Sequence, residues 1–220
     1  SIKQVGLPIQ IFGQLGCKQI IITNSSGCLV PAWDLGDIMI VNGHYDFTFR
    51  NDICNPKLIE GTHYYNQQLI NLVLESNPEL RLGKYGWVLG PVYETKAEIQ
   101  NMRAHGVDAV GMSTIPEVLI AYELGIDVLV LALMSNYAVG LTNDKLSHQT
   151  VLDNSIKHNK NLGYGSAIHS IFLKAKEINA DILVTIDADG QHKVEDIVKL
   201  VEPIKKGDGD LIIGSRFLDV

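Results

Sequence analysis

Short runs of β-branched and aliphatic residues recur along the chain, and between most of them apolar residues return every three or four positions. The first pattern is typical of buried strands and the second of helices. The predicted strands are Gln19–Thr23, Ile38–Val41, Trp87–Leu89, Asp108–Gly111, Val128–Met134, Ile182–Ile186 and Leu211–Ile213. The predicted helices are His63–Glu75, Lys96–Ala104, Ile115–Glu123, Ser166–Ile178 and Val194–Lys205. Their alternation predicts an α/β protein with a mixed or parallel sheet.

A polar, turn-rich passage interrupts this pattern after Asp153. Asn, His and Lys residues lead from there into Gly163-Tyr164-Gly165, a composition typical of a linker or loop. We therefore predict a boundary that divides the chain into a first unit of residues 1–153 and a second of residues 154–220.

Composition narrows the class of protein. With 46% hydrophobic and 20% charged residues, the chain is typical of a globular protein with a buried core. The net charge of −7 argues against a nucleic-acid partner, because a phosphate backbone would be repelled. The longest strongly apolar run, Val128–Met134, falls far short of the roughly 20 residues of a membrane helix. Three cysteines without metal-binding spacing suit a reducing compartment, so we expect a cytoplasmic protein.

Small and polar residues follow several of the predicted strands. Thr23–Gly27 forms one such segment and is expected to be a turn after its strand, and Ser113-Thr114 and Ser135-Asn136 follow two others. Such residues at the carboxyl ends of strands let a ligand approach the backbone of an open α/β sheet. A purely structural explanation also exists, since Ser113 or Thr114 could cap a helix.

A further segment, Gly90-Pro91-Val92-Tyr93-Glu94-Thr95, places an aromatic ring beside a carboxylate just before a helix. Read alone, Glu94 and Thr95 could simply be helix-start residues. The phrases GPVYETKAEI and GVDAVGMSTIPEV, the Ser-Asn pair after an apolar strand, and Ser147-His148 beyond it occur in one order. In that order they resemble the trimeric purine nucleoside phosphorylases over residues 1–153. The resemblance implies a sheet of phosphorylase type and a trimer.

The resemblance also assigns catalytic roles. Glu94 is expected to hydrogen-bond the pyrimidine-ring edge of the purine, and Asn136 to hold the base near N7 and O6, where charge collects as the base leaves. An Asn can donate and accept at once, which suits a 6-oxopurine, whereas an Asp would better suit an adenine amino group. His148 is expected to meet the ribose 5′-hydroxyl.

The remaining substrate-binding residues follow from the same resemblance. Tyr93 is expected to stack on the base, and Val110 and Met112 to pack around base and sugar. The phosphate or ribose is expected near Ser25 and Ser113, with Asn24 beside them.

The implied reaction is phosphorolysis of inosine or guanosine to free base and ribose 1-phosphate, with phosphate as a co-substrate and no metal cofactor. The family's glycine- and serine-rich phosphate loop and its Arg/His segment have no counterpart ahead of Ser1. We therefore expect a phosphorylase-like domain truncated at its N-terminus.

The second unit carries an acidic pair. Asp187 and Asp189 follow the predicted strand Ile182–Ile186, and residues two apart on an extended segment face the same way, so together they could ligate a hard cation. A solvated Asp- and Gly-rich turn is the alternative for this pair taken alone.

Around this pair, NLGYGSAI, DILVTIDADGQH and LIIGSRF resemble the family 2 glycosyltransferases, in particular the dolichol-phosphate mannosyltransferases. The resemblance implies a partial α/β unit of the GT-A-like type, lacking both flanks of that family. It also implies Mg²⁺ or Mn²⁺ at Asp187 and Asp189, holding the diphosphate of a nucleotide sugar.

Three functional hypotheses follow. The first is purine nucleoside phosphorolysis in nucleoside salvage, and the second is metal-dependent transfer of a sugar from a nucleotide sugar. The third is a chimeric or truncated chain that binds nucleoside without catalysis.

Overall fold

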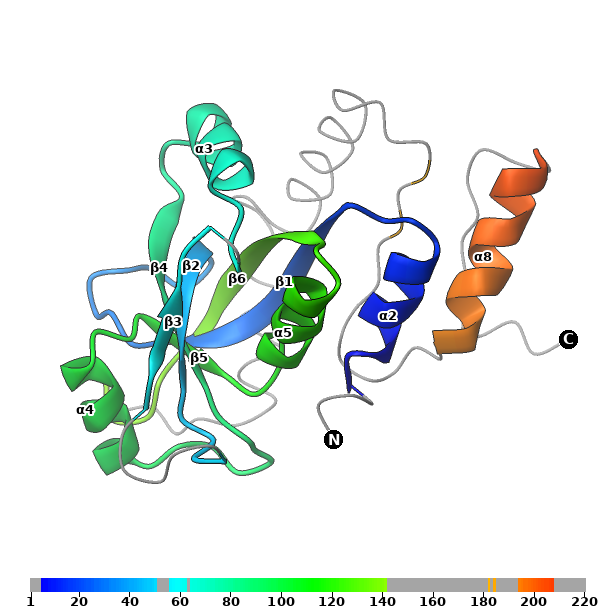
Figure 1. The fold of residues 1–220 in the computed structure, drawn as a ribbon. Coiled ribbons are helices and arrows are strands. Elements are labelled where there is room, and N and C mark those ends of the chain that lie inside the picture. Colours follow the sequence, from blue (N-terminus) through cyan, green and yellow to red (C-terminus); the bar gives the residue numbers. More distant parts are fainter. Residues whose placement is uncertain are drawn as a thin grey trace, which may run out of the picture.

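The computed structural model describes residues 5–50, 56–62, 64–141, 182, 184 and 194–207. Figure 1 shows the elements formed by these residues. The strands are β1 Gln19–Cys28, β2 Ile38–Asp46, β3 Leu58–Glu60, β4 Arg81–Trp87, β5 Ala109–Gly111 and β6 Asp127–Tyr137. The helices are α2 Leu7–Gln14, α3 Gln67–Ser76, α4 Lys96–Ala104, α5 Ile115–Glu123 and α8 Val194–Lys206.

The strands form one mixed sheet in the order β3-β2-β4-β5-β1-β6, and a further pairing between β2 and β6 closes it into a ring. β1 and β6, β2 and β4, and β4 and β5 pair in parallel, whereas β1 and β5, β2 and β3, and β2 and β6 pair antiparallel. The predicted α/β class with a mixed or parallel sheet is confirmed, and the sheet is mixed.

The described strands that were predicted all differ from their predicted bounds, and β1 and β4 show why. β1 continues to Cys28, so the expected turn at Thr23–Gly27 is wrong: these residues pair with β6. Backbone pairing with a long neighbour outweighs the low strand propensity of Asn, Ser and Gly. β4 ends at Trp87, where a strand was predicted to begin. The sequence did not indicate this strand because Gly83 and Gly86 interrupt its apolar pattern.

Helix termini follow local chemistry. α4 has its predicted bounds, and a capping box fixes its start, in which Thr95 and Glu98 bond each other's backbone. α5 also has its predicted bounds, with Pro116 in its first turn. α3 starts four residues later than predicted, because Asn66 Oδ1 accepts the Leu69 N–H at 3.0 Å and caps the helix there. The sequence patterns did not predict α2 or β3.

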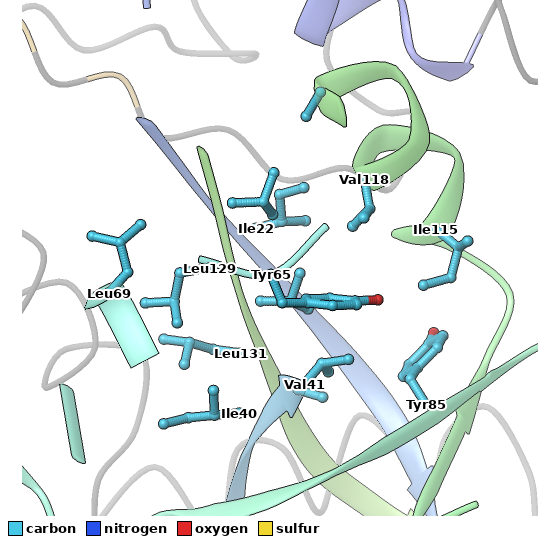
Figure 2. Packing of buried hydrophobic residues seen from close by; sticks show 14 of the residues in the cluster. Ile22, Ile40, Val41, Tyr65, Leu69, Tyr85, Ile115, Val118, Leu129 and Leu131 are labelled. Atoms are coloured by element: carbon cyan, nitrogen blue, oxygen red, sulfur yellow. The ribbon is translucent and has the colours of Figure 1, made fainter. Parts of the chain in front are cut away.

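The main hydrophobic core lies between the sheet and the helices. Figure 2 shows Ile22 of β1, Leu129 and Leu131 of β6, and Val118 of α5 packed in one cluster, with Tyr65 and Tyr85 among them. Each of these side chains is buried.

Helix α8 belongs to the same core. Ile197 and Val201 are buried in the cluster that also contains Ile9 and Phe12 of α2, and Figure 1 shows α8 beside α2. The predicted helix Val194–Lys205 is thus confirmed with one more residue at its end. The predicted helix Ser166–Ile178, the predicted strand Leu211–Ile213 and most of the predicted strand Ile182–Ile186 lie outside the described residues.

Among the described residues, no helix is long and apolar enough to cross a membrane.

Candidate active site

Three strands bring candidate residues together at Gly27. In the register of the sheet, Gly27 lies opposite Val110 of β5 on one side and Asn136 of β6 on the other. A Cβ at Gly27 would lie 3.2 Å from Val110 Cγ1 and 3.3 Å from Asn136 Nδ2. The absence of a side chain at Gly27 therefore lets these two predicted site residues approach each other across β1.

A local network orients the Asn136 side chain, which is 7% exposed. The pairing of β1 with β6 shifts register here, since Ser26 pairs with Met134 and Gly27 with Asn136, and Ser135 is left as the extra residue. The Ser135 hydroxyl bonds both the Ser26 carbonyl oxygen, at 3.3 Å, and Asn136 Oδ1, at 3.0 Å. Asn136 Nδ2 donates to the Tyr137 carbonyl oxygen at 3.1 Å. The amide is thus held in one orientation at the end of β6.

A second network joins β1 to the start of α5. Asn24 Nδ2 donates to Thr114 Oγ1 at 2.7 Å, and Ser26 Oγ donates to Asn24 Oδ1 at 2.5 Å. The hydroxyl oxygens of Ser113 and Thr114 are 3.3 Å apart. The predicted residues Asn24 and Ser113 therefore belong to one hydrogen-bonded group, which has Thr114 at its centre.

Thr114 occupies the N-cap position of α5 with φ 79°, a left-handed conformation that is rare for a β-branched residue. Its side chain is fully buried and makes no capping bond to the helix. Ser113 or Thr114 as an ordinary N-cap is therefore wrong, because the Thr114 hydroxyl is turned toward Asn24. Backbone strain of this kind is typical of functional sites.

Tyr85 of β4 lies behind this turn. A Cβ at Gly111 would collide with its hydroxyl group, which donates to the Ser113 carbonyl oxygen at 3.4 Å. Figure 2 shows the hydroxyl end of Tyr85 directed toward Ile115 at the start of α5. Burial raises the pKa of Tyr85 well above its ordinary value, so the phenol stays protonated and remains a donor.

Glu94 and Tyr93 lie on the loop between β4 and α4. Tyr93 is 37% exposed, whereas Glu94 is partly buried, and burial raises the pKa of its carboxyl group. Met112 connects this loop to the strand ends, because its side chain fills the space that a Cβ at Gly90 would need. Among the described residues, no hydrogen bond joins Glu94 to Asn136.

Thr95, and not Glu94, is the N-cap of α4. The helix-start explanation therefore holds for Thr95 and leaves Glu94 available for another role.

One other predicted residue lies on the sheet, and three lie outside the described part of the chain. Ser25 is exposed on β1, between Asn24 and Ser26. His148, Asp187 and Asp189 lie outside the described residues. Within the described part of the chain, no cluster of three or more His, Cys, Asp or Glu side chains is arranged to hold a metal ion.

Sequence reasoning missed two buried polar residues beside the site, Tyr85 and Glu117. Glu117 is 3% exposed, and burial raises its pKa to about 7. The sequence did contain a signal for Glu117, because it is an acid placed among the apolar residues of the first two turns of the helix IPEVLIAYE. Tyr85 carried no such signal, since only the pairing of β4 with β5 brings it beneath the site.

Comparison with known families agrees with this arrangement. The model of the phosphorylase superfamily matches residues 3–164, and the chain belongs to this superfamily. The model of glycosyl transferase family 2 matches residues 154–219. Both resemblances seen in the sequence motifs are thereby confirmed, and the two matches overlap at residues 154–164.

Individual relatives carry the name purine nucleoside phosphorylase. The chain is 34% identical over 164 residues to purine nucleoside phosphorylase 1 of Bacillus subtilis, covering 70% of this chain and 60% of the relative. It is 33% identical over 152 residues to the purine nucleoside phosphorylase of Mycobacterium tuberculosis, covering 69% and 57%. The chain thus spans about 60% of the length of these curated relatives.

Solved structures show the same likeness. The Schistosoma mansoni purine nucleoside phosphorylase in complex with inosine is 30% identical, with a TM-score of 0.66, and the match covers 84% of this chain and 69% of that one. The Schistosoma enzyme in complex with guanosine is 29% identical, with a TM-score of 0.65, and the match covers 84% and 70%. The mixed sheet is therefore of phosphorylase type.

Proposed function

We propose that this chain acts in the phosphorolysis of 6-oxopurine nucleosides, splitting inosine or guanosine with phosphate into free base and ribose 1-phosphate. The observation that carries the proposal is the meeting of Val110 and Asn136 across Gly27. The similarity to phosphorylases in complex with inosine and guanosine supports purine nucleosides as the substrate class.

Asn136 is the residue on which catalysis depends most in this proposal. As the glycosidic bond breaks, negative charge develops on the purine at N7 and O6, and an oriented amide donor there stabilises the transition state more than the ground state. The bonds from Ser135 and to Tyr137 limit the reorganisation that the amide needs. An amide also offers both a donor and an acceptor to a 6-oxopurine.

Glu94 and Tyr93 complete base recognition in the proposal. The Glu94 carboxylate accepts hydrogen bonds from the pyrimidine-ring edge of the purine, and the Tyr93 ring stacks on its face. Both lie on the β4–α4 loop, which the contact of Met112 with Gly90 fastens to the strand ends. Binding residues often lie on loops that a rigid sheet holds in position.

Phosphate attacks C1′ of a ribosyl cation-like transition state, so the reaction requires positioning and no covalent enzyme nucleophile. We place the phosphate or the ribose hydroxyls near Ser25 and Ser113, with Asn24 fixing the turn that presents Ser113. His148 is assigned to the ribose 5′-hydroxyl. A homotrimer in the cytoplasm is part of this proposal, and sedimentation equilibrium of the purified chain tests the oligomeric state.

The first experiment measures release of hypoxanthine from inosine by the purified chain with and without phosphate. Asn136→Ala is expected to lower kcat/KM by about 100-fold, as removal of one transition-state donor typically does. Asn101→Ala, at an exposed site on α4, is the matched control and is expected to leave the rate unchanged. A folded wild-type chain that shows no phosphate-dependent release contradicts the proposal.

The preference between adenosine and inosine gives a second test of the role of Asn136. Asn136→Asp replaces the donor with an acceptor that matches the amino group of adenine. The ratio of kcat/KM for adenosine to that for inosine is expected to rise at least tenfold. An unchanged ratio contradicts the assignment of Asn136 to the purine 6-position.

A second candidate function is sugar transfer from a nucleotide sugar, favoured by the family match over residues 154–219. In this proposal Asp187 and Asp189 hold Mg²⁺ or Mn²⁺. Calorimetry is expected to detect Mn²⁺ binding that is lost in Asp189→Ala and retained in Asp34→Ala, a control in the phosphorylase-like part. Equal Mn²⁺ binding by both variants contradicts this assignment.

A further inference from the structure

Ser113, Thr114 and Ile115 form a γ-turn of the rare kind that has positive φ at its central residue. The Ile115 N–H donates to the Ser113 carbonyl oxygen at 2.9 Å, and Thr114 between them has φ 79° and ψ −49°. Such dihedral angles cost free energy at a β-branched residue and persist only where the surroundings enforce them. The bonds that neighbouring elements make to this turn therefore decide whether it keeps its shape.

Two side chains of the sheet bond to the turn. Asn24 Nδ2 donates to Thr114 Oγ1 at 2.7 Å, and the Tyr85 hydroxyl donates to the Ser113 carbonyl oxygen at 3.4 Å. This carbonyl oxygen is also the acceptor that closes the turn, so it receives bonds from both Tyr85 and the Ile115 N–H. Tyr85 therefore bonds the peptide group that links Ser113 to the strained residue Thr114.

A glycine provides the room for the Tyr85 hydroxyl group. Gly111 does not have a positive φ, so its backbone conformation does not require glycine. A Cβ at this position would collide with the Tyr85 oxygen. Tyr85 is fully buried, where a hydroxyl group is unfavourable compared with the bare ring of phenylalanine unless it is hydrogen-bonded. The bond to the Ser113 carbonyl oxygen gives a reason for both residues.

We infer that Tyr85 is a positioning residue for phosphate binding, because its hydroxyl holds the Ser113 carbonyl group and thereby sets the direction in which the turn presents the Ser113 hydroxyl. Ser113 is half-buried and Thr114 is fully buried, so Ser113 is the residue that a ligand can reach. The inference rests on the proposed function, which places phosphate or ribose near Ser113. Of these two ligands we assign phosphate, since Ser113 lies just before the N-terminus of α5, where the helix dipole favours an anion.

The test compares Tyr85→Phe with wild type in the phosphorolysis of inosine, because this substitution removes the hydroxyl and keeps the ring that fills the core. Loss of one hydrogen bond is expected to raise the KM for phosphate about fivefold and to change the KM for inosine by less than about twofold. Tyr65→Phe is the matched control. Tyr65 is buried in the same core, but its hydroxyl bonds His44 Nδ1 at 2.7 Å, so both KM values are expected to stay at the wild-type level (Figure 2).

A second comparison determines whether Tyr85 acts through Ser113. In a Ser113→Ala background the hydroxyl that binds phosphate is absent, so Tyr85→Phe is expected to change the KM for phosphate by less than about twofold. An equal rise in both backgrounds overturns the inference, because Tyr85 would then act by a route other than Ser113. A rise in the KM for inosine as large as that for phosphate overturns it as well.

Amide hydrogen exchange of Ile115 supplies a readout that does not require turnover. Its N–H closes the turn, so exchange is expected to speed up about threefold or more in Tyr85→Phe and to stay close to the wild-type rate in Tyr65→Phe. If the variants show this pattern but wild type shows no phosphorolysis, the proposed function fails while the hold of Tyr85 on the turn stands. Unchanged Ile115 exchange in Tyr85→Phe overturns the inference.

Discussion

Asn24 Nδ2 donates to Thr114 Oγ1 over 2.7 Å, which joins the middle of β1 to the start of α5 across 90 positions of sequence. Asn24 also accepts a bond from Ser26, so its amide is held at both ends. The position of the Ser113–Thr114 turn relative to the sheet depends directly on this one side chain.

Asn24→Ala is therefore expected to lower the free energy of unfolding by about 2 kcal/mol, since the hydroxyl groups of the buried residues Ser26 and Thr114 lose their partner. It is also expected to lower kcat/KM for inosine at least tenfold, because the turn that carries Ser113 loses its link to β1. Urea unfolding and initial rates measure the two effects. Asn101→Ala is the control, and equal behaviour of the two variants contradicts the prediction.

Gly111 packs so closely against Tyr85 that a larger residue at position 111 is expected to destabilise the protein. Gly111→Ala is expected to destabilise the protein by about 2 kcal/mol, because the new Cβ collides with the Tyr85 hydroxyl group. Adding Tyr85→Phe removes the colliding oxygen and is expected to recover part of that loss. Thermal unfolding of both single variants and the double variant checks the coupling, and strictly additive effects count against it.

Buried Glu117 predicts a dependence of stability on pH. Its pKa is about 7 in the folded protein and near 4.5 when exposed, so the folded state binds the proton more tightly. The free energy of unfolding contributed by this group is fully present below pH 4.5, falls as the pH rises to about 7, and is lost above it. The total change is on the order of 3 kcal/mol.

Glu117→Gln removes this titration. Urea unfolding at about pH 5 and about pH 8 is expected to show that wild type loses more stability than the Gln variant between these two values. Tyr85, the titratable neighbour that the Glu117 charge reaches, stays protonated over this range and does not contribute. Parallel stability curves for the two proteins would falsify the assignment of the raised pKa.

The place of α8 in the main hydrophobic core predicts that the segment with the second family match contributes to the stability of the segment with the first. Ile197→Asp is expected to destabilise the protein by about 3 kcal/mol or more, because it buries a charge in the shared core. Val198→Asp, on the same helix but 38% exposed, is the matched control and is expected to cost less than about 0.5 kcal/mol.

Tryptophan fluorescence is the appropriate measurement for this pair of variants. The two tryptophans, Trp33 and Trp87, both lie in the phosphorylase-like part of the chain. A transition that Ile197→Asp leaves in place would show that α8 does not support that part.

The boundary predicted after residue 153 remains a prediction. Helix α8 belongs to the predicted second unit, but its buried side chains are part of the hydrophobic core of the first unit. The Ile197 variant therefore also tests whether the two units unfold independently.

The sequence by itself determined the elements whose signals are local. α4 and α5 have the predicted bounds because apolar periodicity, the Thr95–Glu98 capping box and Pro116 all act within one or two helical turns. The family was likewise evident from short motifs, and the motif residues Val110 and Asn136 do meet at one place in the sheet.

Only the tertiary structure decided how the site is supported. β1 extends through Asn24–Cys28, Tyr85 lies beneath Gly111, and Thr114 is held in a left-handed conformation, all through contacts with residues distant in sequence. Strand pairing and buried hydrogen bonds depend on which segments become neighbours, and local propensity does not encode that choice. The candidate substrate-binding residues could therefore be proposed from the sequence, whereas the buried residues behind them, such as Tyr85, required the fold.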